Sequence, residues 1–300
     1  MTLDPSTVAV LTGTTRALVY GSAALVVGAA VFDTGVLSHA TLEPADRAAA
    51  RTRARRIAQV AAAVLLLGYA ARFYIQVMDS FAVAVPTGEM VRQLFFFTRA
   101  WGLGMLAQLA IGASLFALLT VVRRAVSPPL AVVAIAAPLA ALSVPLTGHA
   151  VSHGGPVPFA VQATHVFAVG SWLGTLAVLW MVCRKTMPAT GLVSIIKAFS
   201  PLALASAAMV AVAGTAAVFV HVGTPGDLVS TGYGLVLLVK IALFLAAASV
   251  GYVNWKHVTP ELDRGGPRSQ FTRAAALEIA LGTVAILATA LLTSLPQPGE

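Results

Sequence analysis

Four of the six histidines fall between residues 149 and 221, within or beside successive apolar runs. His149 and His153 belong to the uncharged segment "TGHAVSHGGPVP" (residues 147–158), His165 follows inside the next apolar run, and His221 closes the run after it. Neutral imidazole binds copper, zinc and haem iron, so these side chains could hold a metal ion or act as axial haem ligands. Each one taken alone could equally be a hydrogen-bonded side chain at a membrane surface. The spacing leaves these three alternatives open.

The composition indicates which solvent surrounds the protein that carries these histidines. Hydrophobic residues make up 58% of the 300 residues and charged residues 10%, with a mean hydropathy of +0.88. Soluble domains carry roughly 25% charged residues, so the natural solvent of this chain is lipid. Apolar runs of about 20 residues, long enough to cross a bilayer, recur along the sequence. We therefore expect an all-α polytopic membrane protein whose main partner is the lipid bilayer.

Proline, glycine and charged residues divide the chain into eight predicted spans within a single integral membrane domain, residues 1–300. The N-terminus lacks the basic region of a cleaved signal peptide, so we expect it to be mature sequence. The predicted spans cover about residues 15–38, 57–78, 95–122, 130–148, 158–182, 199–221, 234–255 and 273–295.

The charge pattern predicts how these spans are oriented. The net charge is +8, and most of the 19 basic residues fall in alternate loops, such as Arg51 and Arg55 in the first and Arg264 and Arg268 in the seventh. Basic loops stay in the cytoplasm, so both termini and the segment with His149 are predicted to lie on the periplasmic side. This distribution also argues against nucleic acid as a partner.

Several polar residues fall inside the predicted spans, where a charge is costly and often marks a functional site. His165 and Lys240 each lie about two turns from the outer surface, so we expect Lys240 to line an outer cavity. Glu278 is predicted near the inner end of the last span, too deep to pair with Lys240. Asp33, near the inner end of the first span, is predicted to be solvated at the interface. Arg72 could line a site or snorkel to the surface.

Longer motifs resemble a known family. "LTGHAVSH" followed by "QATHVFAVGSWLGTLAVL" resembles the bacterial copper-resistance protein D (CopD) family, in which a Gly-His pair ends one span and the next span carries a histidine and Trp-Leu-Gly-Gly-Leu. Thr175 replaces the second glycine here. "GYGLVLLVKIALFLAAASVGYVNW" and "RAAALEIALGTVAILATALLTSLPQP" also resemble later spans of that family. The resemblance is good over residues 140–298 and loose over residues 1–139.

The resemblance implies a polytopic inner-membrane protein that handles copper, generally by uptake from the periplasm with a copper-binding CopC-type partner. By motif, His149, His165 and Lys240 are the positions carried over, with Trp172 lining the site. His153 or His221 would be a third ligand on topology alone. The alternative is a membrane redox or assembly protein that binds haem through two histidines. We expect no enzymatic activity, because the sequence has no phosphate-binding glycine loop and no phosphorylation segment.

Overall fold

The computed structural model describes residues 5–83, 85–97, 99–125, 129–147, 155–185, 187–221 and 226–293, and every element within them is helical. Eight helical segments are long and apolar enough to cross a membrane, as predicted. In order they are α1 (Pro5–Val31) with η1 (Phe32–Val36) and α2 (Leu37–His39), α3 (Pro44–Phe81), α5 (Arg99–Arg124), α6 (Leu130–Ala134) with α7 (Ala136–Ser143) and η2 (Val144–Thr147), α9 (Pro156–Val169) with η3 (Gly170–Gly174) and α10 (Thr175–Cys183), α11 (Ala189–His221), α13 (Gly232–Val253) with η4 (Asn254–Val258) and α14 (Thr259–Asp263), and α15 (Arg268–Leu292). The short helices α4 (Gly88–Phe97) and α12 (Asp227–Ser230) lie between spans.

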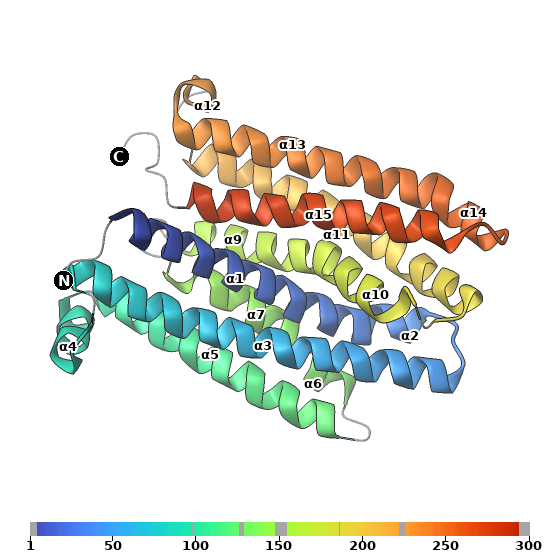
Figure 1. Ribbon diagram of the computed structural model, residues 1–300, viewed down its shortest axis with the longest axis horizontal. Coiled ribbons are helices and arrows are strands. Elements are labelled where there is room, and N and C mark those ends of the chain that lie inside the picture. The colour runs from blue at the N-terminus through green and yellow to red at the C-terminus, as the bar shows by residue number, and fades with distance from the viewer. Residues whose placement is uncertain are drawn as a thin grey trace.

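Successive spans run in opposite directions, so the junctions between them gather at the two ends of the bundle (Figure 1). One end holds α2, the start of α3, the end of α5 and α14, with most of the basic residues, and we call it the basic end. The other end holds the first and last described residues, and we call it the terminal end. There Arg16 Nη1 donates a hydrogen bond of 2.6 Å to the Thr293 carbonyl oxygen, which joins the first span to the last.

The arginines predicted to lie in the first loop are instead part of a helix. α3 begins at Pro44, a position that favours proline, and continues through Arg51 and Arg55. Alanine and arginine are strong helix formers, so the helix begins well before the apolar residues from which the span was predicted. The connection that precedes it is therefore only four residues long, 40–43.

Asp33 is buried rather than solvated, so the prediction for this residue is wrong. Its two carboxylate oxygens accept hydrogen bonds from Nε of Arg51 (2.5 Å) and Nε of Arg55 (2.7 Å). The Arg55 side chain is itself 8% exposed. Because both arginines sit on the extended α3, they reach back to the first span and neutralise the carboxylate.

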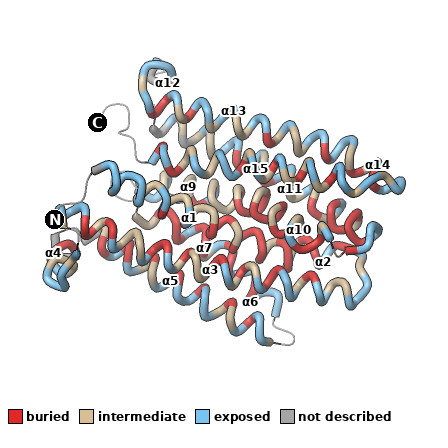
Figure 2. Tube along the Cα trace, in the orientation of Figure 1, coloured by how far each residue is buried: buried red, intermediate tan, exposed pale blue. Residues whose placement is uncertain are grey.

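The core of the bundle is centred on α1, which packs against α3, α7, α10 and η3 (Figure 2). Small residues permit the closest of these approaches. A Cβ atom at Gly28 would overlap the backbone of Gly174 and Thr175, and one at Gly170 would overlap Val27. Gly170 and Gly174 therefore serve helix packing, as small residues spaced by four commonly do between membrane helices. Cys183 is completely buried in the same core.

The C-terminal helices form a second layer beside this core. α11 packs along α9, and α13 packs along α15. α13 and α14 form an outer edge of the bundle on which exposed and partly exposed residues predominate (Figure 2). The aligned helices α9, α11, α13 and α15 therefore surround the region to which His165, Trp172 and Lys240 belong.

Candidate metal site

Of the four candidate histidines, the structure describes His165 and the backbone of His221, both in the terminal half of the bundle. His165 lies nine residues after Pro156, the first residue of α9, and His221 is the last residue of α11. His149 and His153 lie outside the described residues, between Thr147 at the end of η2 and Gly155 before α9. The side chain of His221 is also outside the description. His165 is therefore the one candidate ligand whose surroundings the structure gives.

His165 has an unused coordinating atom. Its Nδ1 is buried and has no hydrogen-bond partner in the described part of the chain. A buried polar atom without a partner is costly, by about 1–3 kcal/mol, and calls for an explanation such as a bound ion. The ring packs beside Gly214 of α11, where an added Cβ would lie 3.9 Å from His165 Cε1. Lys240 of α13 lies within electrostatic range of the imidazole.

His221 shares a helix face with the residue that contacts His165. Seven residues separate Gly214 and His221, which is two turns of α11 and about 10 Å along its axis. Because α9 and α11 pack side by side, the backbone of His221 lies nearer the terminal end than His165. A ligand pair formed by these two residues would need their side chains to span much of that interval.

A buried hydrogen-bond network fixes the chain that leads to His149. Gln108 of α5 donates from Nε2 to the Ser143 carbonyl oxygen (2.9 Å), and Thr147 donates to Gln108 Oε1 (3.2 Å). Tyr69 of α3 shares a 2.7 Å hydrogen bond with the hydroxyl of Ser143. Thr147 is thus anchored two residues before His149 by helices of the N-terminal half.

Trp172, predicted to line the site, is buried and anchored to the last span. Its Nε1 donates a 2.7 Å hydrogen bond to Glu278 Oε1, and its ring packs edge-on against Phe244 of α13 at 5.9 Å between centroids. Glu278 lies ten residues after Arg268, about 15 Å along α15. The helix starts five residues earlier than predicted, so Glu278 lies deeper in the bundle than the sequence suggested. Both residues stand out in the sequence, but their spacing gives no sign of this hydrogen bond.

Described residues do not complete a metal site. Among them there is no group of three or more His, Cys, Asp and Glu side chains that could share an ion. The proposed set depends on His149, His153 and His221, whose side chains are not described, so their role as ligands stays a prediction. Of the two predicted lining residues, Lys240 lies near His165, whereas Trp172 is seven residues further along its helix.

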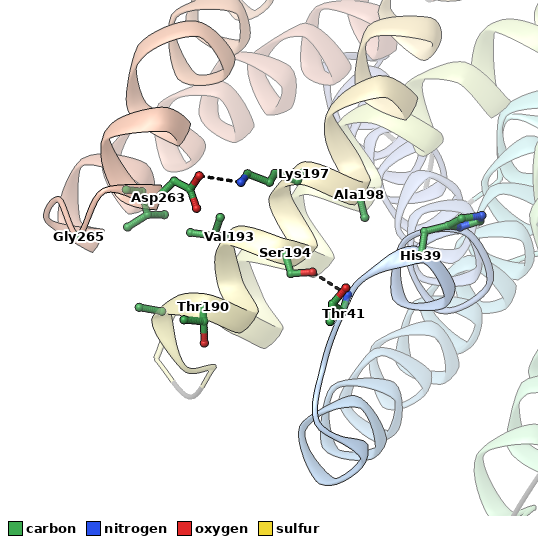
Figure 3. Close-up of a pocket in the computed structure, with 11 residues that line it drawn as sticks. His39, Thr41, Thr190, Val193, Ser194, Lys197, Ala198, Asp263 and Gly265 are labelled. Carbon is green, nitrogen blue, oxygen red and sulfur yellow. Dashed lines mark hydrogen bonds and ion pairs between the residues drawn. The ribbon is translucent and has the colours of Figure 1, made fainter.

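A separate pocket of 620 Å³ opens at the basic end, between α2, α11 and α14 (Figure 3). Lys197 and Asp263 form an ion pair across it at 2.7 Å, and the Thr41 amide donates to the Ser194 hydroxyl over 2.7 Å. His39 lines the pocket, but its ring points away from the ion pair and its Nδ1 bonds the Gly35 carbonyl oxygen. With Asp263 already paired, the pocket offers few groups to a metal ion.

Comparison with known proteins supports the family that the sequence resembles. Residues 193–292, which comprise most of α11, all of α13 and α15, and the elements between them, match the family described as copper resistance protein D. The match supports the assignment of this region to that family. The match falls within residues 140–298, where the sequence resembles CopD. The chain is therefore a multi-pass membrane protein with a copper-related CopD region.

One curated relative also matches the chain. The copper transport protein CutJ of Bacillus subtilis (strain 168) is 29% identical over 158 residues, which cover 51% of this chain and 28% of that protein. No solved structure matches the chain. Neither the family description nor the relative's name denotes an enzyme.

Proposed function

We propose that this protein binds copper at the terminal end of its bundle and carries it across the inner membrane into the cytoplasm. The observation that carries the proposal is the buried, unpartnered Nδ1 of His165. It lies inside a membrane span next to the CopD-matched helices α11 and α13. An imidazole in this position is a ready nitrogen ligand for copper.

The remaining ligands of the proposed site are His149, with His153 or His221 as a third. Three described elements support this assignment, because η2 precedes His149, α9 follows His153 and α11 ends at His221, all toward the terminal end. Two imidazoles suit Cu(I) in a near-linear arrangement, and a third nitrogen ligand would favour Cu(II). We expect Lys240 to limit the positive charge that the site accepts, because Lys240 lies within electrostatic range of His165.

The direction of transport follows from the charge pattern. The basic end is cytoplasmic by the positive-inside rule, so the histidine end faces the periplasm and loads copper there. A periplasmic copper-binding protein of the CopC type is the partner we propose for this step. The alternative of two axial haem ligands receives no support from the family match, which is described by copper resistance.

Copper binding by histidine variants tests this function. His165→Ala and His149→Ala are each expected to lower copper affinity strongly in the purified chain, measured by competition with a chromophoric chelator. The double variant should cost little more, because one surviving ligand cannot hold the ion. His257→Ala is the matched control, since His257 is exposed at the basic end. Small and additive losses would show that the two histidines do not share an ion.

A further inference from the structure

One face of α13 carries a series of residues that points toward the polar groups of the neighbouring helices. Lys240, Ala247 and Asn254 are spaced by seven residues, and Phe244 and Gly251 lie between them at helical spacing. Lys240 lies near His165, and Phe244 contacts Trp172. This face of α13 therefore runs from the candidate metal site past Trp172 toward the basic end.

Gly251 is the point at which this face meets Glu278. A Cβ atom at Gly251 would lie 3.0 Å from Glu278 Oε1 and 3.4 Å from Oε2. The carboxyl group thus rests directly on the α13 backbone, and its Oε1 also accepts the hydrogen bond from Trp172 Nε1. Asn254 follows one turn further along the same face.

Buried polar atoms without a hydrogen-bond partner occur on the spans that carry this face and Trp172. We call the series of polar groups from His165 past Trp172 and Glu278 to Asn254 the polar path. In the described part of the chain, the buried side-chain atoms without a hydrogen-bond partner are His165 Nδ1, Ser171 Oγ and Asn254 Oδ1. His165 lies seven residues before Trp172, toward the terminal end, and Ser171 adjoins Trp172 in the chain. Asn254 lies three residues after Gly251, toward the basic end. Ser171 and Asn254 belong to the π-helical segments η3 and η4, a geometry that is frequent at functional sites.

Among the described residues, Glu278 differs from the other buried carboxylate, Asp33, in forming no ion pair. Asp33 is held by two arginines, whereas no described lysine, arginine or histidine forms an ion pair with Glu278, which is 3% exposed. An isolated carboxylate in an apolar interior is strongly disfavoured relative to its neutral form. One N–H donor from Trp172 does not replace a counter-ion.

We propose that Glu278 is a proton-exchanging carboxyl group, placed between Trp172 and Gly251 on the polar path that leads from His165 to Asn254. In the empty protein it holds a proton. When a monovalent copper cation enters the path, the carboxyl O–H bond breaks, its electron pair stays on oxygen, and the proton leaves to solvent. The cation's charge compensates the new carboxylate, and no electron is transferred. The proton returns when the cation has left.

The two other ionisable side chains along this path, Lys240 and His165, lie at a different depth from Glu278. Lys240 is eleven residues from Gly251, about 16 Å along α13, and His165 is seven residues from Trp172, about 10 Å along its helix. The remaining titratable groups on α15 and on the elements packed against it are Arg16, Tyr20, Cys183, Tyr233, Tyr252, Lys256, His257, Glu261, Asp263, Arg268 and Arg273. Among the described residues, Glu278 is the carboxyl group buried at this depth.

Infrared spectroscopy of the purified, copper-free chain tests where the proton is. We expect a protonated-carboxyl C=O band at neutral pH that disappears in Glu278→Gln and persists in Glu261→Gln, an exposed carboxyl control. Trp172→Phe removes the hydrogen-bond donor and should shift the band to higher frequency. This second variant keeps the test decisive if Glu278→Gln does not fold. The absence of such a band, or a band unchanged in both Glu278→Gln and Trp172→Phe, overturns the proposal.

The coupling to copper rests on the proposed function and is measured separately. Cu(I), added without oxygen as its acetonitrile complex to weakly buffered protein, should release a proton from the parent that Glu278→Gln does not release. Equal release by both proteins, with copper bound in both, contradicts the coupling. A parent that binds no copper refutes the proposed function, and the infrared band then decides the protonation of Glu278 alone.

Discussion

Trp172 and Glu278 join two spans that lie more than a hundred residues apart in the sequence, through a single hydrogen bond of 2.7 Å inside the bundle. The bond connects the middle of the fifth span to the eighth, and Phe244 adds the seventh span to the same contact. The carboxyl group that accepts it is buried against the backbone of α13. This contact therefore joins the helix that carries His165 to the CopD-matched helices.

Removal of the donor should weaken this junction. Trp172→Phe keeps an aromatic ring against Phe244 but leaves a buried acceptor unpaired, which costs about 1–3 kcal/mol. We expect a lower midpoint of thermal unfolding in detergent. Trp255→Phe is the matched control, because Trp255 is 54% exposed. Equal midpoints for the two variants would show that the hydrogen bond does not stabilise the bundle.

Removal of the carboxylate from the buried ion pair at the basic end should destabilise the protein more than removal of the Trp172 hydrogen bond. Asp33→Asn removes the charge opposite Arg51 and the buried Arg55, and breaking such a pair costs about 3–5 kcal/mol. Asp263→Asn removes the exposed partner of Lys197, for which about 0–1 kcal/mol is expected. Unfolding in a denaturant series measures both. A loss no larger for Asp33→Asn than for Asp263→Asn would contradict the assigned burial.

The close approach of α1 and η3 predicts that two glycines of α1 differ in how well they tolerate substitution by alanine. Gly28→Ala places a methyl group into the backbone of Gly174, so a loss of about 1–3 kcal/mol is expected. Gly13→Ala, in the same helix, meets no atom within 4 Å and should be neutral or slightly stabilising. The yield of folded monomer and its thermal midpoint give the comparison. A well-folded Gly28→Ala variant would contradict the close approach.

The orientation of the bundle can be measured with single cysteines. In a Cys183→Ala background, Ser230→Cys at the terminal end should react with a membrane-impermeant maleimide added to spheroplasts. Arg264→Cys at the basic end should react only after lysis. Both positions are exposed in the structure. The reverse pattern would place the histidines on the cytoplasmic side and would contradict import.

Much of this fold could be predicted from the sequence, because hydropathy alone reveals stretches that must cross a membrane. All eight spans were expected from the sequence. The helical extension through Arg51 and Arg55 was missed, since a hydropathy pattern ends where charges begin. Its consequence, the pairing of Asp33, was missed with it.

The candidate site was less predictable because it depends on the register between helices. Lys240 was placed at the depth of His165 from the sequence, and it lies within electrostatic range of the imidazole, while its role as a lining residue stays a prediction. Glu278 was placed too close to the inner end, because the start of its helix was set five residues late. The contact between Gly251 and Glu278 leaves no local signal in the sequence, since each residue lies in an ordinary apolar helix. The ligand roles of His149, His153 and His221 stay predictions.

The central claim is that His165 is a ligand of bound copper, and X-ray absorption at the copper K-edge tests it most directly. Copper-loaded parent protein should show a first shell that contains nitrogen, with the outer-shell scattering characteristic of imidazole. His165→Ala, loaded under the same conditions, should lose part of that imidazole signal or retain no copper. His257→Ala should give the spectrum of the parent. Identical spectra for the parent and His165→Ala would contradict the account.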